Sequence, residues 1–203
     1  MKKQDTIGSV IYHFFFALTS GVMGAIIASW PLLFFFMAIE KTNETVGMSL
    51  FKVMGNYNQL MGYLLLPWHR QLKMADFPTS ANAAAHFAEV KGLFQLTALV
   101  FLLCLALHFY FQQAKRKPYL GMSQVAALIF MVLPVVVLPF AIANFDDFFR
   151  TFHTLLFHNS NWLFDPNTDP IIDVLTEGFF SSCFAVGGAV YELYFAQYLI
   201  SRH

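Results

Sequence analysis

The sequence predicts an all-α polytopic membrane protein with four transmembrane helices. The first reason is composition: 58% of the 203 residues are hydrophobic and only 12% are charged, whereas soluble domains carry roughly 25% charged residues. The second is the presence of four apolar runs of about the 20 residues that a helix needs to cross a bilayer core. One small core cannot hide this many apolar side chains, so lipid is the expected solvent. The net charge near zero argues against a nucleic-acid partner.

The predicted spans cover residues 9–39, 93–113, 122–143 and 178–200 of a single integral membrane domain, residues 1–203. The first span is long, which indicates a tilt or a kink near Pro31, and it is too long for the apolar part of a cleaved signal peptide. The third contains Pro134 and Pro139, which membrane helices tolerate when neighbours satisfy the freed carbonyls. In the fourth, "VGGAV" at 186–190 predicts a close helix contact.

Basic residues in the short loops set the expected orientation, because they favour the cytoplasmic side. They occur near both termini and in the turn 114–121, as Lys2, Lys3, Lys115, Arg116, Lys117 and Arg202. Segment 144–177 has one basic residue, Arg150, and six acidic ones. We therefore expect cytoplasmic termini in a bacterial cell membrane, with segments 40–92 and 144–177 outside. The five basic residues of segment 40–92 weaken this assignment without reversing it.

Both outer segments are predicted to contain helices. Residues 46–67 mix apolar and polar side chains and favour a helix at the membrane surface or packed on the bundle, ended by Pro67. In "PTSANAAAHFAEVKGLF" (78–94), Thr79 or Ser80 is a suitable N-cap for a helix that continues into the second span. On that helix, His86 and Glu89 share a face because they are three residues apart.

The segment "NFDDFFRTFHTLLFH" (144–158) is predicted to form a helix that ends in the polar turn after it. Asp146, Arg150, His153 and Phe157 fall within about 60° of one another on a helical wheel, so they form one stripe. Asp146 is placed either to orient His153 or to pair with Arg150 at i,i+4. Trp162, in the turn, is typical of a membrane interface.

His86 and His153 are the candidate catalytic residues, because each has a carboxylate at helical spacing near the outer boundary. An imidazole can take up and return a proton near pH 7. No nucleophile elbow, phosphate-binding glycine loop or HExxH motif is present, which suits a substrate that supplies its own nucleophile. No cofactor is expected. A metal site made of His86, Glu89 and His153 stays open as an alternative. Structural or surface roles are expected for the other histidines, His13, His69, His108, His158 and His203.

The segment "FHTLLFHNSNWLFDPNTDPIIDVLTEGFF" (152–180) resembles the signature of a family of small four-span bacterial membrane proteins, the lipoprotein intramolecular transacylase family. "HFAEVK" (86–91) and "NYNQLMGYL" (56–64) resemble two further blocks of that family. The matching positions of the first block are Phe152, His153, Phe157, Asn159, Trp162, Asp165, Pro166, Thr168, Asp169, Ile172, Leu175, Glu177, Phe179 and Phe180. Two positions depart from the family: Glu89 stands where an aspartate is expected, and Ser160 where an acid is common. The longer side chain of Glu89 could alter positioning, and Ser160 puts a charge role there in doubt.

The resemblance implies a membrane-embedded acyltransferase that acts on the diacylated N-terminus of a bacterial lipoprotein. Such an enzyme moves the sn-2 acyl chain of the diacylglyceryl-cysteine to the cysteine α-amine. In this interpretation His86 and His153 move protons, and Asn159, Tyr57 or Arg150 donates to the oxyanion. Glu89, Asp146 and Trp162 support the site.

Two alternatives stay open at this point. One is a membrane lipid or lipoprotein ester hydrolase that uses the same histidines. The other is a transporter or sensor subunit without enzymatic activity, for which the acidic Glu192 within the fourth span is the best argument.

Overall fold

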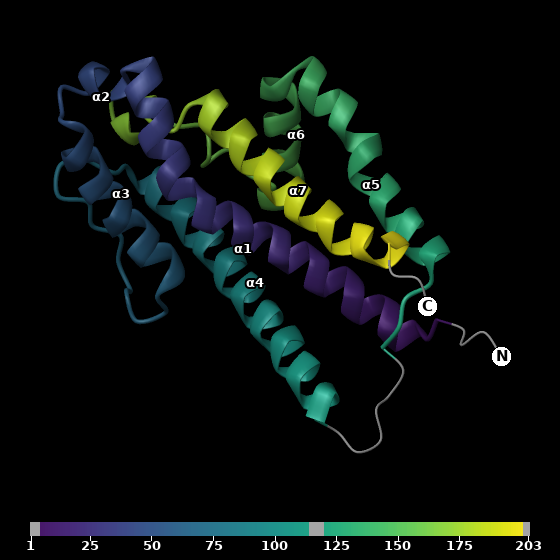
Figure 1. Cartoon of the computed structure of the whole chain (residues 1–203). Helices are drawn as coiled ribbons and strands as arrows, with labels where there is room; N and C mark the ends of the chain where they lie inside the picture. The colour runs from purple at the N-terminus through teal and green to yellow at the C-terminus, as the bar shows by residue number, and fades with distance from the viewer. Residues whose placement is uncertain (1–4, 114–119, 201–203) are drawn as a thin grey trace. The chain divides into compact units, whose positions relative to one another are not determined.

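The computed structural model describes residues 5–113 and 120–200. The described chain is helical and has no strand. In order, its elements are α1 (Ile7–Glu40), α2 (Thr42–Thr45), α3 (Leu50–Leu65), α4 (Ala81–Gln113), α5 (Gln124–Ala143), α6 (Phe145–Phe157), the 3₁₀ helix η1 (Pro170–Asp173) and α7 (Glu177–Ile200) (Figure 1). His203 and the basic residues of the termini and of the turn before Leu120, on which the predicted orientation depends, lie outside the described residues.

Four of these helices, α1, α4, α5 and α7, are long and apolar enough to cross a membrane. The prediction of four spans is therefore confirmed. Helix α4 begins twelve residues before the predicted span at residue 93, because the helix capped near Ser80 continues into the span without a break. The Ser80 hydroxyl accepts a hydrogen bond from the Ala83 N–H at 3.1 Å, so of the two candidates, Thr79 and Ser80, the N-cap is Ser80.

The chain divides into two compact units, each described by itself. Unit 1 contains residues 1–25, 97–143 and 184–203, and unit 2 contains residues 26–96 and 144–183. Helices α1, α4 and α7 contribute to both units, whereas α5 belongs to unit 1 and α2, α3, α6 and η1 belong to unit 2.

In unit 1, α1 and α7 approach closely where both carry glycine. A Cβ added to Gly21 would lie 2.7 Å from the Gly187 carbonyl oxygen, and one added to Gly24 would lie 2.9 Å from Val190 Cγ2. Side chains at these positions would push the helices apart, so glycine permits the contact. The prediction of a packing surface at 186–190 is confirmed at Gly187, whereas Gly188 faces open space.

In unit 2, α3 packs on the part of α1 that belongs to the same unit. The buried Tyr57 hydroxyl donates to Ser29 Oγ at 2.7 Å, and Trp30 Nε1 donates to Asn58 Oδ1 at 2.7 Å. The sequence predicted that this helix lies either at the membrane surface or packed on the bundle, and the packed position is therefore correct. Leu66 has extended backbone angles at the C-cap of α3, as expected for a residue that precedes a proline, here Pro67.

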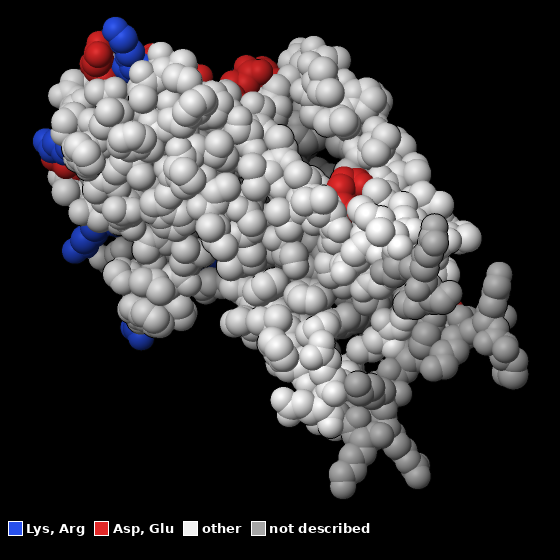
Figure 2. Space-filling model, viewed as in Figure 1, with Lys and Arg blue, Asp and Glu red and all other residues white. Residues whose placement is uncertain are grey.

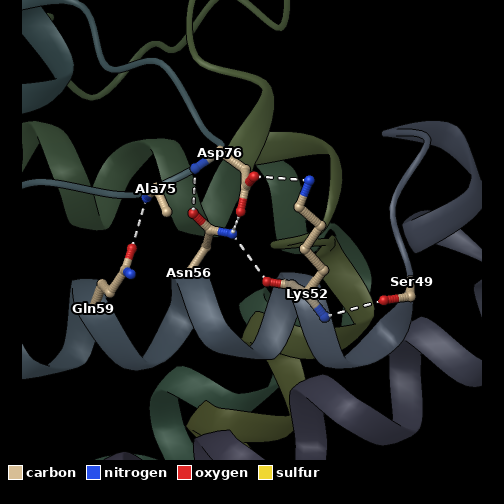
Figure 3. Close-up of polar contacts among 6 residues, drawn as sticks. All are labelled: Ser49, Lys52, Asn56, Gln59, Ala75 and Asp76. Atoms are coloured by element: carbon tan, nitrogen blue, oxygen red, sulfur yellow. Dashed lines mark hydrogen bonds and ion pairs between the residues drawn. The ribbon is translucent and has the colours of Figure 1, made fainter.

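Asn56, on α3, fixes the loop that leads to α4 (Figure 3). Its Oδ1 accepts from the Asp76 N–H at 2.9 Å, and its Nδ2 donates to Asp76 Oδ2 at 2.8 Å. Lys52 Nζ lies 2.8 Å from Asp76 Oδ1, and Gln59 Oε1 accepts from the Ala75 N–H. Because Asn56 is buried, with 1% of its surface exposed, these bonds hold the loop against α3 through satisfied polar groups.

Charged side chains of unit 2 gather around α2, α3 and the loop after α3 in the space-filling view (Figure 2). The described parts of the spanning helices instead carry exposed apolar side chains, for example Leu96, Leu99 and Leu102 of α4 and Val132 and Val136 of α5. An apolar exposed surface of this kind is suited to lipid. The polar loops and the lipid-facing helices thus follow the pattern of a membrane protein.

Candidate active site

Helices α4 and α6 bring the two candidate histidines together inside unit 2. The ring centroids of His86 and His153 are 5.7 Å apart, and only 6% and 9% of the two residues is exposed. His86 is in the second turn of α4, so its place depends on where α4 begins. His153 is on the buried face of α6 and is the one buried residue of that helix. The sequence-predicted pair is therefore close in space.

The His153 ring is held between aromatic side chains. Its centroid is 3.9 Å from that of Phe149 and 5.0 Å from that of Trp162. His153 Nδ1 lies 2.9 Å from the Phe149 carbonyl oxygen. A carbonyl oxygen can only accept a hydrogen bond, so Nδ1 carries the proton and Nε2 keeps its lone pair. Burial lowers the pKa of His153, and the bond to the Phe149 carbonyl opposes that shift. The uncharged form with a basic Nε2 is thus favoured at neutral pH.

The His86 ring lies near a carboxylate and close to aromatic rings. Its Nδ1 is buried without a hydrogen-bond partner and lies 3.9 Å from Glu89 Oε2. That separation exceeds hydrogen-bond range, but at that distance the carboxylate would attract an imidazolium. The centroids of Phe157 and Phe164 lie 4.6 Å and 5.7 Å from the His86 centroid, both edge-on. These rings keep bulk water from the imidazole.

Asn159 connects Glu89 to the turn that follows α6. Its Nδ2 donates to Glu89 Oε1 at 2.9 Å and to the Phe157 carbonyl at 2.8 Å. Its own backbone carbonyl accepts from Trp162 Nε1 at 2.8 Å. The turn starts at His158, whose φ of 51° lies in the left-handed region and reverses the chain. Asn159 thereby joins the carboxylate beside His86 to the indole beside His153.

Asp169 fixes the start of α4 from the loop before α7. The Asp169 side chain is 3% exposed, and its Oδ1 accepts from the Ser80 N–H at 2.6 Å. Asp165 orders the turn that contains Asp169, because its carbonyl accepts hydrogen bonds from the N–H groups of Thr168 and Asp169 at 3.0 and 2.8 Å. A carboxylate at a helix N-terminus is favourable for the orphan N–H groups and for the helix dipole.

Three other predicted site residues have different partners. Arg150 Nε donates to Asp146 Oδ2 at 2.7 Å, and both side chains are more than half exposed, so Asp146 pairs with Arg150 and does not orient His153. The Tyr57 hydroxyl donates its hydrogen bond to Ser29 Oγ. The Tyr57 ring lies against Trp30 and Phe179. Among residues 5–113 and 120–200, no group of three or more His, Cys, Asp or Glu side chains is placed to hold a metal ion.

Sequence reasoning placed Phe157 on the stripe with His153, but it missed the rings of Phe149 and Phe164 and the bond between Asp169 and the Ser80 N–H. Phe149 and Phe164 carry no individual signal in a chain with 25 phenylalanines. Asp169 had a signal, because "DPNTD" at 165–169 is a turn sequence with two acids. Only the fold, however, could show that the second acid meets Ser80.

These features define a class: a helical membrane protein with four spans and a pair of adjacent, buried imidazoles near a carboxylate. The model of the family described as lipoprotein intramolecular transacylase Lit matches residues 7–180, and the chain belongs to this family. The protein is accordingly a membrane-integral transferase that acts on lipoproteins. The hydrolase and the transporter or sensor subunit are not favoured.

Solved structures share the fold. The chain is similar to the lipoprotein intramolecular transacylase Lit from Bacillus cereus, with 21% identity, 94% of this chain and 90% of that chain covered, and a TM-score of 0.78. A variant of that protein with one histidine replaced by arginine gives a TM-score of 0.69 at 21% identity, with 94% and 86% covered. A variant with alanine gives 0.65 at 20% identity, with 94% and 90% covered. No curated protein sequence matched.

Proposed function

We propose that the protein moves the sn-2 acyl chain of a diacylglyceryl-cysteine at a lipoprotein N-terminus to the α-amine of that cysteine. The observation that supports this most is the pair of buried imidazoles, 5.7 Å apart, in a member of the transacylase family. The products are an N-acyl group and an S-monoacylglyceryl group on the same cysteine. Because amine and ester belong to one molecule, holding them together supplies effective molarity, which lowers the barrier by several kcal/mol, roughly 7–11 in the best cases.

The amine nitrogen must lose two protons in the reaction, and each of the two imidazoles accepts one of them. The α-ammonium, with a pKa of about 8, first loses a proton, which passes to His153 Nε2 and then to solvent. The free amine attacks the sn-2 ester carbonyl, so that an N–C bond forms. His86 takes the second amine proton and returns it to the sn-2 glycerol oxygen as the C–O bond breaks. Glu89 stabilises the imidazolium that forms on His86.

The supporting residues keep this arrangement rigid. Asn159 holds the Glu89 carboxylate, and Trp162 closes one face of the His153 ring. Tyr57, Asp146 and Arg150 act at a greater distance, since Tyr57 orders α3 on α1 and the Asp146–Arg150 pair stiffens the exposed side of α6. The acyl chains lie against the aromatic rings around the imidazoles, which exclude water from the tetrahedral intermediate.

The proposed site faces the extracytoplasmic side, with both termini in the cytoplasm. The basic residues of the termini and of the turn 114–121 support this orientation. Both histidines belong to segments that leave or enter the spans on the other side. This is also the side on which the α-amine of a mature lipoprotein becomes free after its signal peptide is removed.

The experiment uses a bacterial host whose lipoproteins are only diacylated. Expression of the protein should convert the N-terminal lipopeptide of a reporter lipoprotein to a species of unchanged mass, since the acyl chain moves within the molecule. Fragmentation in a mass spectrometer should find one acyl group as an amide. Loss of one acyl group with release of a free fatty acid would instead establish a hydrolase.

A further inference from the structure

The loop after α3, residues 66–73, forms one side of a pocket within unit 2. The pocket has a volume of about 440 Å³, which is in the range of small-molecule sites. The second half of α3 forms its other side. The polar lining residues that matter here are Asn58, Gln59, Tyr63 and Lys73, and no Asp or Glu lines the pocket. None of these side chains takes part in the proposed transacylation.

The two side-chain amides of the pocket are left as hydrogen-bond donors. Asn58 Oδ1 accepts from Trp30 Nε1 at 2.7 Å, and Gln59 Oε1 accepts from the Ala75 N–H at 2.7 Å. An indole N–H and a backbone N–H can only donate, so both amide oxygens are already in use. The polar group that each amide still offers to a ligand is therefore its NH₂.

Tyr63 adds a hydroxyl that is available to a ligand. Only 6% of the residue is exposed, and Lys91 Nζ lies 4.3 Å from the centroid of its ring. Its hydroxyl has no hydrogen-bond partner among residues 5–113 and 120–200, yet it is not one of the unpartnered atoms that are wholly buried. The hydroxyl thus keeps some free surface in a residue that lines the pocket. Nearly buried hydroxyls normally have a partner, which a ligand in the pocket provides.

Loop 66–73 brings positive charge to the pocket. It contains Arg70 and Lys73 and no Asp or Glu. Within the described parts of the chain, neither side chain has a carboxylate at ion-pair distance. In the space-filling view, blue side chains stand below α3 with no red ones beside them (Figure 2). A free ammonium group next to O–H and N–H donors favours a ligand that has acceptor oxygens and negative charge.

Lys91 places this loop at the boundary of the bilayer core. Its Nζ donates to the Leu66 carbonyl at 3.2 Å and also to the His69 carbonyl. Residues 92–113, the rest of α4, contain no charged side chain and make about 33 Å of helix, against a core of about 30 Å. Lys91 therefore lies at one edge of the core whether α4 is upright or moderately tilted. Trp68, 69% exposed, is a residue type typical of that interface.

We propose that this pocket binds the phosphate group of an anionic phospholipid. Lys73 is the charged donor, and the Tyr63 hydroxyl and the NH₂ groups of Asn58 and Gln59 are the neutral donors. The headgroup lies at the boundary that Lys91 marks, and the acyl chains of the lipid extend into the apolar layer beside it. His86 and His153 take no part, so the lipid binds whether or not the protein transfers acyl groups.

The test is lipid retention by the purified full-length protein, measured by native mass spectrometry after mixing with phosphatidylglycerol, phosphatidylcholine, diacylglycerol or inorganic phosphate. The wild type should retain phosphatidylglycerol in preference to phosphatidylcholine, which has no net charge, and to diacylglycerol, which has no phosphate. Lys73→Gln should weaken the retention of phosphatidylglycerol about tenfold, the effect of losing one hydrogen bond to a charged group. Tyr63→Phe, which removes only the hydroxyl, should also weaken it.

Lys41→Gln is the matched control, because Lys41 is an exposed lysine of the same unit that does not line the pocket. It should retain phosphatidylglycerol as the wild type does. If Tyr63→Phe fails to fold, Lys73→Gln alone decides. Equal retention of phosphatidylcholine or diacylglycerol by the wild type, or equal retention of phosphatidylglycerol by Lys73→Gln and Lys41→Gln, overturns the proposal. Binding of inorganic phosphate without retention of phosphatidylglycerol overturns the assignment to a lipid. Because the readout is lipid retention, the proposed transacylation can fail while this site stands.

Discussion

Asp169 and Ser80, from two distant parts of the chain, meet at the N-terminus of α4, where the Asp169 carboxylate accepts the Ser80 N–H at 2.6 Å. His86 follows six positions after Ser80 on the same helix. The contact therefore links the loop before α7 to the position of a proposed catalytic imidazole. Because Asp169 belongs to the sequence block that resembles the family, its placement gives that motif residue a physical role.

Replacement of Asp169 by alanine should destabilise the protein and loosen the start of α4. Loss of one hydrogen bond to a charged group costs roughly 1.5–3 kcal/mol. The free energy of unfolding in detergent, measured with a denaturant, should fall by that amount. Asp169→Asn is the control, because its side-chain oxygen can still accept the Ser80 N–H. Equal stability of the alanine variant and the wild type would show that the bond between Asp169 and the Ser80 N–H has no energetic role.

Glu89 and Asn159 should act as a coupled pair in transacylation. Glu89→Gln removes the charge beside His86, and Asn159→Ala removes the donor that holds that carboxylate. If each acts through the other, the double variant should lose much less activity than the product of the two single losses. Asn161→Ala is the control, since Asn161 contributes only its backbone N–H to Asn159. Strictly multiplicative losses would mean that the two side chains act separately.

The folded protein should lose stability as the pH falls below about 6.5, the ordinary pKa of histidine. Burial lowers the pKa of His153 in the folded state, so the unfolded chain binds more protons in this range. Stability is therefore complete above pH 6.5 and is lost as the pH falls through the pKa of the folded state. Melting temperature as a function of pH should show this slope, and His153→Gln should reduce it.

His69→Gln is the control for the pH experiment, because the His69 side chain is exposed in the folded protein. It should keep the slope of the wild type. A slope of the same size in the His153→Gln variant would contradict the assignment of the pH dependence to the buried His153 imidazole.

Gly21→Ala should destabilise the contact of α1 with α7, whereas Gly188→Ala should be tolerated. The added Cβ at Gly21 would lie 2.7 Å from the backbone oxygen of Gly187, but at Gly188 it meets nothing within 4 Å. Overpacking of this kind costs typically about 1–3 kcal/mol. Melting temperatures of the two variants in the same detergent should separate them. Equal melting temperatures would contradict the close helix contact.

The sequence was sufficient for the four spans and for α3 and α6 between them, because length, hydropathy and proline positions depend on local properties, but it did not predict the short helices α2 and η1. It also selected His86 and His153, since helical spacing and the family blocks both marked them. The sequence did not determine whether Asp146 pairs with Arg150 or orients His153, because both lie on the same face of one helix. In the structure Asp146 pairs with Arg150. Helical spacing alone does not give side-chain positions, so this could not be predicted.

The parts that could not be predicted all involve contacts between distant segments. The Asn159–Glu89 bond joins the turn after α6 to α4, and the Asp169–Ser80 bond joins the loop before α7 to the same helix. The sequence marked Asn159, Glu89 and Asp169 individually but contained no signal for their pairing. Likewise, the rings that enclose the imidazoles come from an abundant residue type whose members differ only in where the fold places them.

The central claim is that His86 and His153 together carry out acyl transfer. The direct measurement is the lipopeptide mass spectrum from a host with diacylated lipoproteins, with His86→Ala, His153→Ala and the control His69→Ala expressed to equal levels. Loss of a proton-transfer residue should cost about 10²- to 10⁴-fold in rate. The account predicts N-acylated product with the control and the diacylated substrate alone with either catalytic variant. N-acylation at the wild-type rate by either variant would contradict it.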